Sequence, residues 1–153
     1  MVEAKRMLDE GEDSSAVHRR GASFAMRKVV IVGDAGVGKT AILSRFVNGW
    51  MPGSRRSTMG ATEKLKSIHF AGTNKKLPLQ IWDIPGGDKF RTLSSIYFRD
   101  ADAAILVCDM TDKDSLNSLK SVWLRELQSI APEGMIKVVV GNKVDILDEM
   151  DET

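Results

Sequence analysis

The clearest chemical pattern of the chain is the run G-D-A-G-V-G-K-T at residues 33–40. It matches G-x-x-x-x-G-K-[ST], in which glycines let backbone N–H groups surround phosphate oxygens at the start of a helix. In such a loop Lys39 reaches the outer phosphates, and the hydroxyl of Thr40 is a ligand for Mg²⁺. A chance glycine turn is the alternative, but a strand-like run precedes the motif and a helical pattern follows it. The motif predicts a bound nucleoside triphosphate and leaves the base open.

A carboxylate that could complete a metal site is Asp83, which ends the apolar run 79–82 and precedes Pro85 and two glycines. An acidic side chain at the C-terminal end of a strand beside a phosphate loop is a typical ligand of the nucleotide's Mg²⁺. The alternative is an aspartate in a strand-end turn, which is common in any protein. The neighbouring phosphate loop favours the metal ligand.

A third group of polar residues, N-K-V-D at 142–145, follows the apolar run 136–140. The carboxylate of Asp145 could accept from both N1–H and the exocyclic amine of guanine, as a charge-assisted pair. Adenine presents no such pair of donors. A polar loop after a strand is the alternative, but the position at a strand end, downstream of a phosphate loop, favours guanine.

Short apolar runs predict the strands that would position these groups. Three of them have the length and composition of buried strands, namely residues 29–32, 103–108 and 136–140. Residues 68–70 and 77–81 alternate in polarity on either side of 72–74, which predicts a two-stranded hairpin. Pro78 cannot donate to a strand ladder, so it indicates that the second hairpin strand starts there.

Helical spacing appears twice among the apolar residues. Residues 42–47 show it directly after the phosphate loop, and Gly49 is expected to end that helix. The second stripe is predicted to open at Asp114 or Ser115 and to close before Pro132, and it contains Leu116, Leu119, Trp123, Leu127 and Ile130. Strands that alternate with helices predict an α/β fold, with a mostly parallel sheet covered by helices on both faces.

The composition is that of one globular domain, with 153 residues, 42% hydrophobic and 28% charged. A net charge of +1 argues against a nucleic-acid partner, and the single cysteine, Cys108, rules out a disulfide framework. The longest apolar run is too short to cross a bilayer. Residues 1–25 are expected to form a disordered leader, 26–149 the folded domain and 150–153 an acidic tail.

The order of the motifs resembles that of Ras-superfamily small GTPases, and most of all the Rab branch. After the phosphate loop come S-T-M-G at 57–60, W-D-x-x-G at 82–86 and N-K-x-D at 142–145. The stretches K-F-R-T at 89–92 and Y-F-R-D-A at 97–101 are similar to Rab sequences. The resemblance runs over residues 27–148. It implies the three-layer P-loop NTPase fold and a switch in vesicle transport.

The resemblance also implies roles for individual residues. GTP or GDP with Mg²⁺ would be the cofactors, and the metal ligands would be Thr40, Thr58 and Asp83. The nucleotide would be bound by Asp34, Ala35, Gly36, Val37, Gly38, Lys39, Thr40, Met51, Thr58, Gly86, Asn142, Lys143 and Asp145. Catalysis would involve Lys39, Thr58, Gly86 and the degenerate position Gly87. Effector, exchange and activating proteins would contact residues 50–63 and 84–99, including an aromatic surface at Trp82 and Tyr97.

Several positions depart from the family pattern, and three of them bear on function. Gly87 stands where the family has the glutamine that orients the attacking water, and this predicts slow or absent hydrolysis. Met51 stands where an aromatic ring stacks on guanine, although Trp50 is adjacent. Glu63 replaces a phenylalanine that is typical of Rabs. A GTP-binding interaction module that does not hydrolyse is therefore an alternative to the enzyme.

The chain stops at Thr153, before the last helix-strand-helix of the family and its prenylated tail. We expect residues 136–140 to form a sheet edge and this chain to carry no lipid anchor. A cytoplasmic location follows, with an endomembrane surface reached only by a longer, lipidated form. A non-functional truncated product is the remaining alternative.

Overall fold

A computed structural model describes residues 24–51, 53, 57–87 and 96–146. Most of the predicted leader, the acidic tail, the stretch 89–92 and part of the predicted partner-binding ranges 50–63 and 84–99 lie outside these ranges. No helix in the described ranges is both long and apolar enough to span a membrane.

The described residues form a five-stranded sheet with the order β2-β3-β1-β4-β5. Its strands are β1 (Arg27–Val32), β2 (Thr62–His69), β3 (Lys76–Asp83), β4 (Ala103–Asp109) and β5 (Ile136–Asn142). Strand β2 is antiparallel to β3, and the other neighbouring pairs are parallel. The carboxyl ends of four strands therefore meet at one edge, where ligands bind in open α/β sheets.

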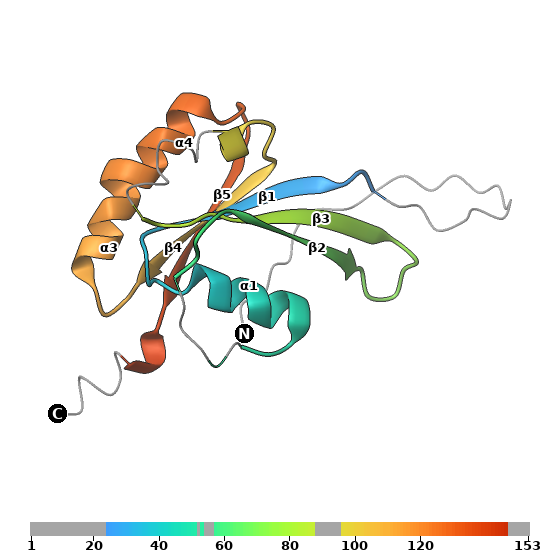
Figure 1. Ribbon diagram of the computed structural model, residues 1–153. Helices are drawn as coiled ribbons and strands as arrows, with labels where there is room; N and C mark the ends of the chain where they lie inside the picture. Colours follow the sequence, from blue (N-terminus) through green and yellow to red (C-terminus); the bar gives the residue numbers. More distant parts are fainter. Residues whose placement is uncertain (1–23, 52, 54–56, 88–95, 147–153) are drawn as a thin grey trace, which may run out of the picture.

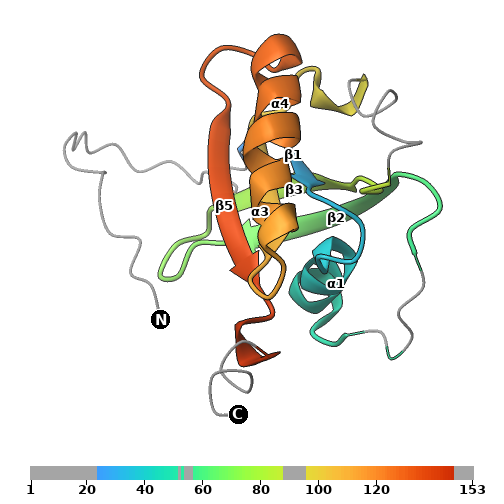
Figure 2. The same cartoon turned by 90° about the vertical axis from the view of Figure 1, so that its left-hand side faces the viewer.

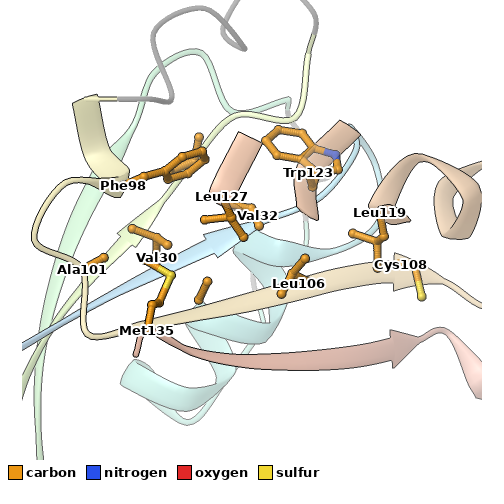
Figure 3. Packing of buried hydrophobic residues seen from close by; sticks show 12 residues of the cluster. Val30, Val32, Phe98, Ala101, Leu106, Cys108, Leu119, Trp123, Leu127 and Met135 are labelled. Carbon is orange, nitrogen blue, oxygen red and sulfur yellow. The ribbon is translucent and has the colours of Figure 1, made fainter. Parts of the chain in front are cut away.

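Helices lie on both faces of the sheet, as predicted. Helix α1 (Lys39–Asn48) lies on one face, and α3 (Lys113–Ser118), η1 (Leu119–Trp123) and α4 (Leu124–Ile130) form a single rod on the other (Figures 1 and 2). Alternate side chains of β1 point to opposite faces of the sheet. Val30 packs in the cluster with Trp123, whereas Val29 packs with Leu43 of α1. Figure 3 shows the larger core cluster, which includes Val32, Phe98, Leu106, Cys108, Trp123 and Leu127.

The ends of the helices follow local chemistry. Gly49 ends α1 with a φ of 80°, and its N–H donates to the Arg45 carbonyl at 3.0 Å, as the sequence predicted. The predicted start of the second helix was wrong. Asp112 is its N-cap, because its side chain accepts from the Asp114 N–H at 3.0 Å. Leu116 is 39% exposed, so it does not belong to the buried stripe.

The predicted start of the hairpin's second strand was also wrong. Strand β3 begins at Lys76, two residues before Pro78, and Pro78 pairs with Ser67 of β2. The ladder between β3 and β1 begins only at Leu79. At Pro78 the strand therefore has a neighbour on one side only, and a residue without an N–H is tolerated there.

Strand β5 is the edge strand that the sequence predicted, but its side chains are not buried. It pairs with β4 alone among the described strands. The exposed fractions of its apolar residues are 63% for Ile136, 48% for Val138 and 58% for Val139. Composition predicted a buried strand because apolar, β-branched runs usually have cover on both faces.

Candidate nucleotide-binding site

The phosphate loop joins β1 to α1 at the carboxyl edge of the sheet. Glycine is required in it for both conformation and space. Gly33 has a φ of 141°, and a Cβ there would lie 2.1 Å from the Val107 carbonyl oxygen. Gly38 has a φ of 99°, and its Cβ would lie 2.2 Å from Asn142 Nδ2. The glycines therefore let the loop pack against the ends of β4 and β5.

Lys39 lies beneath this loop and is only 6% exposed. Its Nζ donates to the carbonyl oxygens of Gly33 and Asp34, at 2.7 Å each. Burial lowers the pKa of Lys39 to about 8, although the nearby carboxylates of Asp83 and Asp34 act in the opposite direction. The structure thus holds an ammonium group against the inside of the loop, where a phosphate would give it a counter-charge.

The three predicted metal ligands lie together beside Lys39. Thr40 Oγ1 donates to Asp83 Oδ2 at 2.5 Å and lies 2.8 Å from Thr58 Oγ1. Asp83 is 1% exposed, and its second oxygen, Oδ1, has no hydrogen-bond partner among the described residues. Burial raises the pKa of Asp83, while the Thr40 bond and the Lys39 charge lower it. Two hydroxyl oxygens and a carboxylate, one oxygen of which is buried and without a partner among the described residues, fit a hard divalent cation such as Mg²⁺.

Gly86 and Gly87 come three and four residues after Asp83 and are both part-buried. A Cβ on Gly86 would lie 2.2 Å from the Asp34 carbonyl carbon and 2.4 Å from the Ala35 nitrogen. The segment after β3 therefore rests on the phosphate loop, and only a glycine fits at this contact.

The predicted base-binding residues are only partly brought together. Asn142 Nδ2 donates to the Val37 carbonyl at 2.8 Å, so the end of β5 is joined to the phosphate loop. Lys143 is half-buried and forms an ion pair with Asp109 at 2.5 Å. Asp145 is exposed, and Met51 is 61% exposed. Neither of these two is enclosed in a preformed pocket, and their roles stay predictions.

Sequence reasoning missed Asp109, which is 8% exposed at the end of β4. Burial alone would raise its pKa, but the bonds from Lys143 and Thr111 outweigh burial and keep the pKa of Asp109 below its ordinary value. A signal did exist, because Asp109 ends a predicted parallel strand in the way that Asp83 does. Ser118 and Trp123 also reach the phosphate loop, and no spacing in the sequence indicated it.

Trp82 and Tyr97, which were expected to form an aromatic surface for partner proteins, are in contact with each other. The rings of Trp82 and Tyr97 are tilted, with centroids 5.1 Å apart. Glu63 lies on the neighbouring strand and accepts a bond from Gln80 Nε2 at 2.8 Å. Glu63 is also the register partner of Trp82, so a carboxylate borders the aromatic pair.

Comparison with known proteins gives the family. The chain matches the model of the Ras family over residues 28–152. It is 42% identical over 122 residues to the GTP-binding protein ypt1 of Schizosaccharomyces pombe, a stretch that covers 80% of this chain and 59% of that protein. It is 41% identical to Ras-related protein Rab-1D of Dictyostelium discoideum, with 80% of this chain and 58% of that protein covered. Human Ras-related protein Rab-30 is 40% identical, with 79% and 58% covered.

This chain therefore belongs to the Ras family, and its relatives include Rab and Ypt proteins. The five-stranded sheet with its phosphate loop is the α/β fold expected for that family. The chain spans about three-fifths of the length of the curated relatives that it matches.

Proposed function

We propose that this chain binds GTP and GDP together with Mg²⁺ and acts as a Rab-like switch in vesicle-mediated transport. The observation that carries the proposal is the convergence of Lys39, Thr40 and Asp83 at one end of a glycine-rich loop. A buried ammonium group and a cluster of hard oxygens stand side by side there. This arrangement suits a polyphosphate with its divalent cation better than any neutral ligand.

In this proposal the backbone N–H groups of residues 34–40 hold the phosphates and Lys39 neutralises their charge. Thr40, Thr58 and Asp83 would be the protein ligands of the metal. Bound Mg²⁺ would offset the charge on the outer phosphate oxygens. The N–H of Gly86 would face the last phosphate, since Gly86 already rests on the loop.

Asp145 would select guanine, with Asn142 and Lys143 holding the base loop against the phosphate loop. The test is competition against fluorescent GDP. We expect GTP to displace it, and ATP to need a concentration about ten- to a hundredfold higher, because a charge-assisted pair is lost with adenine. Asp145→Asn should remove most of this discrimination.

The matched control is Asp114→Asn, the same change at an exposed position in the first turn of α3. It should leave the preference for guanine intact. Equal displacement by ATP and GTP would refute the assignment of the base. So would a preference that survives in Asp145→Asn.

Gly87 supports a second proposal, that the chain holds GTP and hydrolyses it slowly or not at all. Water attacks the last phosphate efficiently only when a side chain holds it in line, and glycine has none. Charge neutralisation by Lys39, and by the cation that Thr40, Thr58 and Asp83 would hold, would remain. A hydrolysis-deficient interaction module is therefore the alternative to an efficient GTPase.

Single-turnover hydrolysis of GTP separates these two proposals. We expect the natural chain to hydrolyse GTP well below about 10⁻⁴ per second, which is the order of the unassisted rate of Ras with its glutamine in place. Gly87→Gln should be faster, whereas Gly53→Gln should not, because a Cβ on Gly53 meets nothing within 4 Å. A natural chain that already hydrolyses GTP faster than this, and does not change in Gly87→Gln, would show that another group positions the water.

Partner proteins would bind residues 50–63 and 84–99, next to the Trp82–Tyr97 pair. Glu63 and its bond from Gln80 give this surface a polar border. We therefore propose effectors, exchange factors and activating proteins that place a cation or hydrogen-bond donor opposite Glu63. Function at endomembranes, with passage through the cytosol, is part of the same proposal.

A further inference from the structure

One side-chain oxygen of the phosphate loop is held by the helical rod, which covers the face of the sheet opposite α1 (Figures 1 and 2). Asp34, the second residue of the loop, accepts two bonds at Oδ1. Ser118 Oγ donates one at 2.8 Å, and Trp123 Nε1 donates the other at 2.8 Å. Both donors come from residues more than 80 positions further along the chain. They join the end of α3 and the turn η1 directly to the loop.

The local geometry of the rod makes this double contact possible. Leu124 N–H donates to the Leu119 carbonyl, which is a five-residue π-type turn inside an otherwise α-helical rod. In a regular α-helix two side chains five residues apart point about 140° away from each other. The π-type turn brings residues five apart toward the same side, so Ser118 and Trp123 reach a single acceptor. Such turns often occur at functional sites.

The backbone of Asp34 also contacts Lys39 and lies next to Gly86. Its carbonyl oxygen accepts from Lys39 Nζ at 2.7 Å, and its carbonyl carbon would lie 2.2 Å from a Cβ on Gly86. A displaced Asp34 would therefore move the carbonyl that holds Lys39 and the surface on which Gly86 rests. Trp123 is fully buried in the core, and in Figure 3 its nitrogen lies on the side of the ring turned away from Phe98.

We propose that Ser118 and Trp123 are positioning residues that hold the phosphate loop, through Asp34, in the shape that receives the nucleotide. The π-type turn is the feature that lets one helix supply both donors. The role in nucleotide retention rests on the proposed function, whereas the holding of the loop does not. A Trp123 that only fills the core would stabilise the fold without acting on the loop.

The test compares Trp123→Phe and Ser118→Ala with the natural chain. Phenylalanine keeps an aromatic ring in the core and removes the N–H. Ser121→Ala is the matched control, since Ser121 Oγ donates to Asn117 within the same rod and does not touch the loop. We expect GDP to dissociate about fivefold faster from Trp123→Phe and about threefold faster from Ser118→Ala, because each loses one bond to a charged acceptor. Ser121→Ala should not change the rate.

Two further measurements separate a positioning role from a structural one. In an Asp34→Ala background, Trp123→Phe and Ser118→Ala should add nothing to the dissociation rate, because their acceptor is gone. Asp34→Asn keeps an Oδ1 acceptor and should lie between the natural chain and Asp34→Ala. Hydrogen exchange of residues 33–39 in the nucleotide-free chain should be faster in Trp123→Phe and Ser118→Ala.

The exchange measurement also separates this inference from the proposed function. Faster exchange in a chain that fails to bind GDP would support the holding of the loop and refute nucleotide binding. Unchanged exchange in both variants, with GDP still bound, would overturn the inference alone. Effects of Trp123→Phe that persist fully in the Asp34→Ala background would also overturn it.

Discussion

Lys39 and Asp83 are ionisable groups in a site that water scarcely reaches. Burial lowers the pKa of Lys39 and raises the pKa of Asp83, so each is shifted toward its neutral form. Each partly offsets the shift of the other by its charge. A phosphate beside Lys39 and a cation beside Asp83 would favour the charged form of each. The site therefore favours ligands that bring both charges together.

The Lys39 shift predicts a pH dependence of nucleotide binding. The pKa of Lys39 is about 8 in the folded chain and 10.5 in its ordinary state, so the folded chain binds fewer protons than the unfolded one between these values. Without a ligand, the free energy of unfolding should rise with pH across this window. Phosphate raises the pKa of Lys39, so GDP binding should take up a proton there and weaken as the pH rises above 8.

Calorimetry checks this at about pH 9 in two buffers that differ in ionisation enthalpy. The apparent binding enthalpy should depend on the buffer for the natural chain. It should not for Lys39→Arg, because a guanidinium stays charged across this range. Identical enthalpies for the natural chain in both buffers would contradict the prediction.

The helical rod begins where β4 ends, and the connection is built from side chains. Ser115 is 1% exposed, and its Oγ accepts from the Asp109 N–H at 2.9 Å and lies within bonding distance of two carbonyl oxygens. Asp112 caps the first turn three residues earlier. The start of the helix thereby fixes the backbone at Asp109, whose carboxylate pairs with Lys143 of the base loop.

Loss of the cap predicts a measurable loss of stability. Asp112→Ala removes the acceptor for the Asp114 N–H and should lower the free energy of unfolding by about 1 kcal/mol. Asp112→Asn keeps an acceptor oxygen and should cost much less. Denaturant unfolding followed by circular dichroism measures both. An asparagine variant as unstable as the alanine variant would show that the charge of Asp112, and not its hydrogen bond, matters.

The two edges of the sheet differ in character. The edge strand β2 carries three charged residues, Glu63, Lys64 and Lys66, which discourage pairing with another chain. The edge strand β5 exposes Ile136, Val138 and Val139, with Lys137 as its single charge. Unpaired backbone next to exposed apolar side chains is a template for association. Among the described strands, the β2 edge is therefore better protected by charge than the β5 edge.

This difference predicts self-association of the 153-residue chain through β5. The mean mass in solution should rise with protein concentration, as measured by sedimentation velocity. Val139→Lys should suppress the rise, because a charge on an edge strand opposes pairing. Met59→Lys introduces the same charge at a residue that is 86% exposed and outside the sheet, and it should have no effect. Equal suppression by both variants would point to net charge rather than to the edge.

The parallel strands β1, β4 and β5, helix α1 and the phosphate loop could be predicted from the sequence because their signals are local. Most of β2 was missed: only residues 68–70 were predicted, whereas the strand is Thr62–His69, because its largely exposed, charged first half shows no apolar alternation. A run of β-branched residues, a glycine after a helix and the spacing of residues 33–40 each involve neighbours along the chain. The position of Asp83 beside Thr40 also followed, because parallel strands bring their carboxyl ends to one edge. The predicted starts of β3 and of the α3 helix were wrong because sheet pairing at Pro78 and the cap at Asp112 outweighed local preference.

Contacts across the fold could not be read from spacing. The bonds from Ser118 and Trp123 to Asp34 depend on a π-type turn, and apolar periodicity does not reveal one. The pairing of Lys143 with Asp109 and the bond from Asn142 to Val37 join residues 34 and 105 positions apart. These partners meet only because β4 and β5 align in one register and the helical rod packs over β1. Local sequence therefore specifies which groups can do chemistry here, and packing decides which of them hold the loop in place.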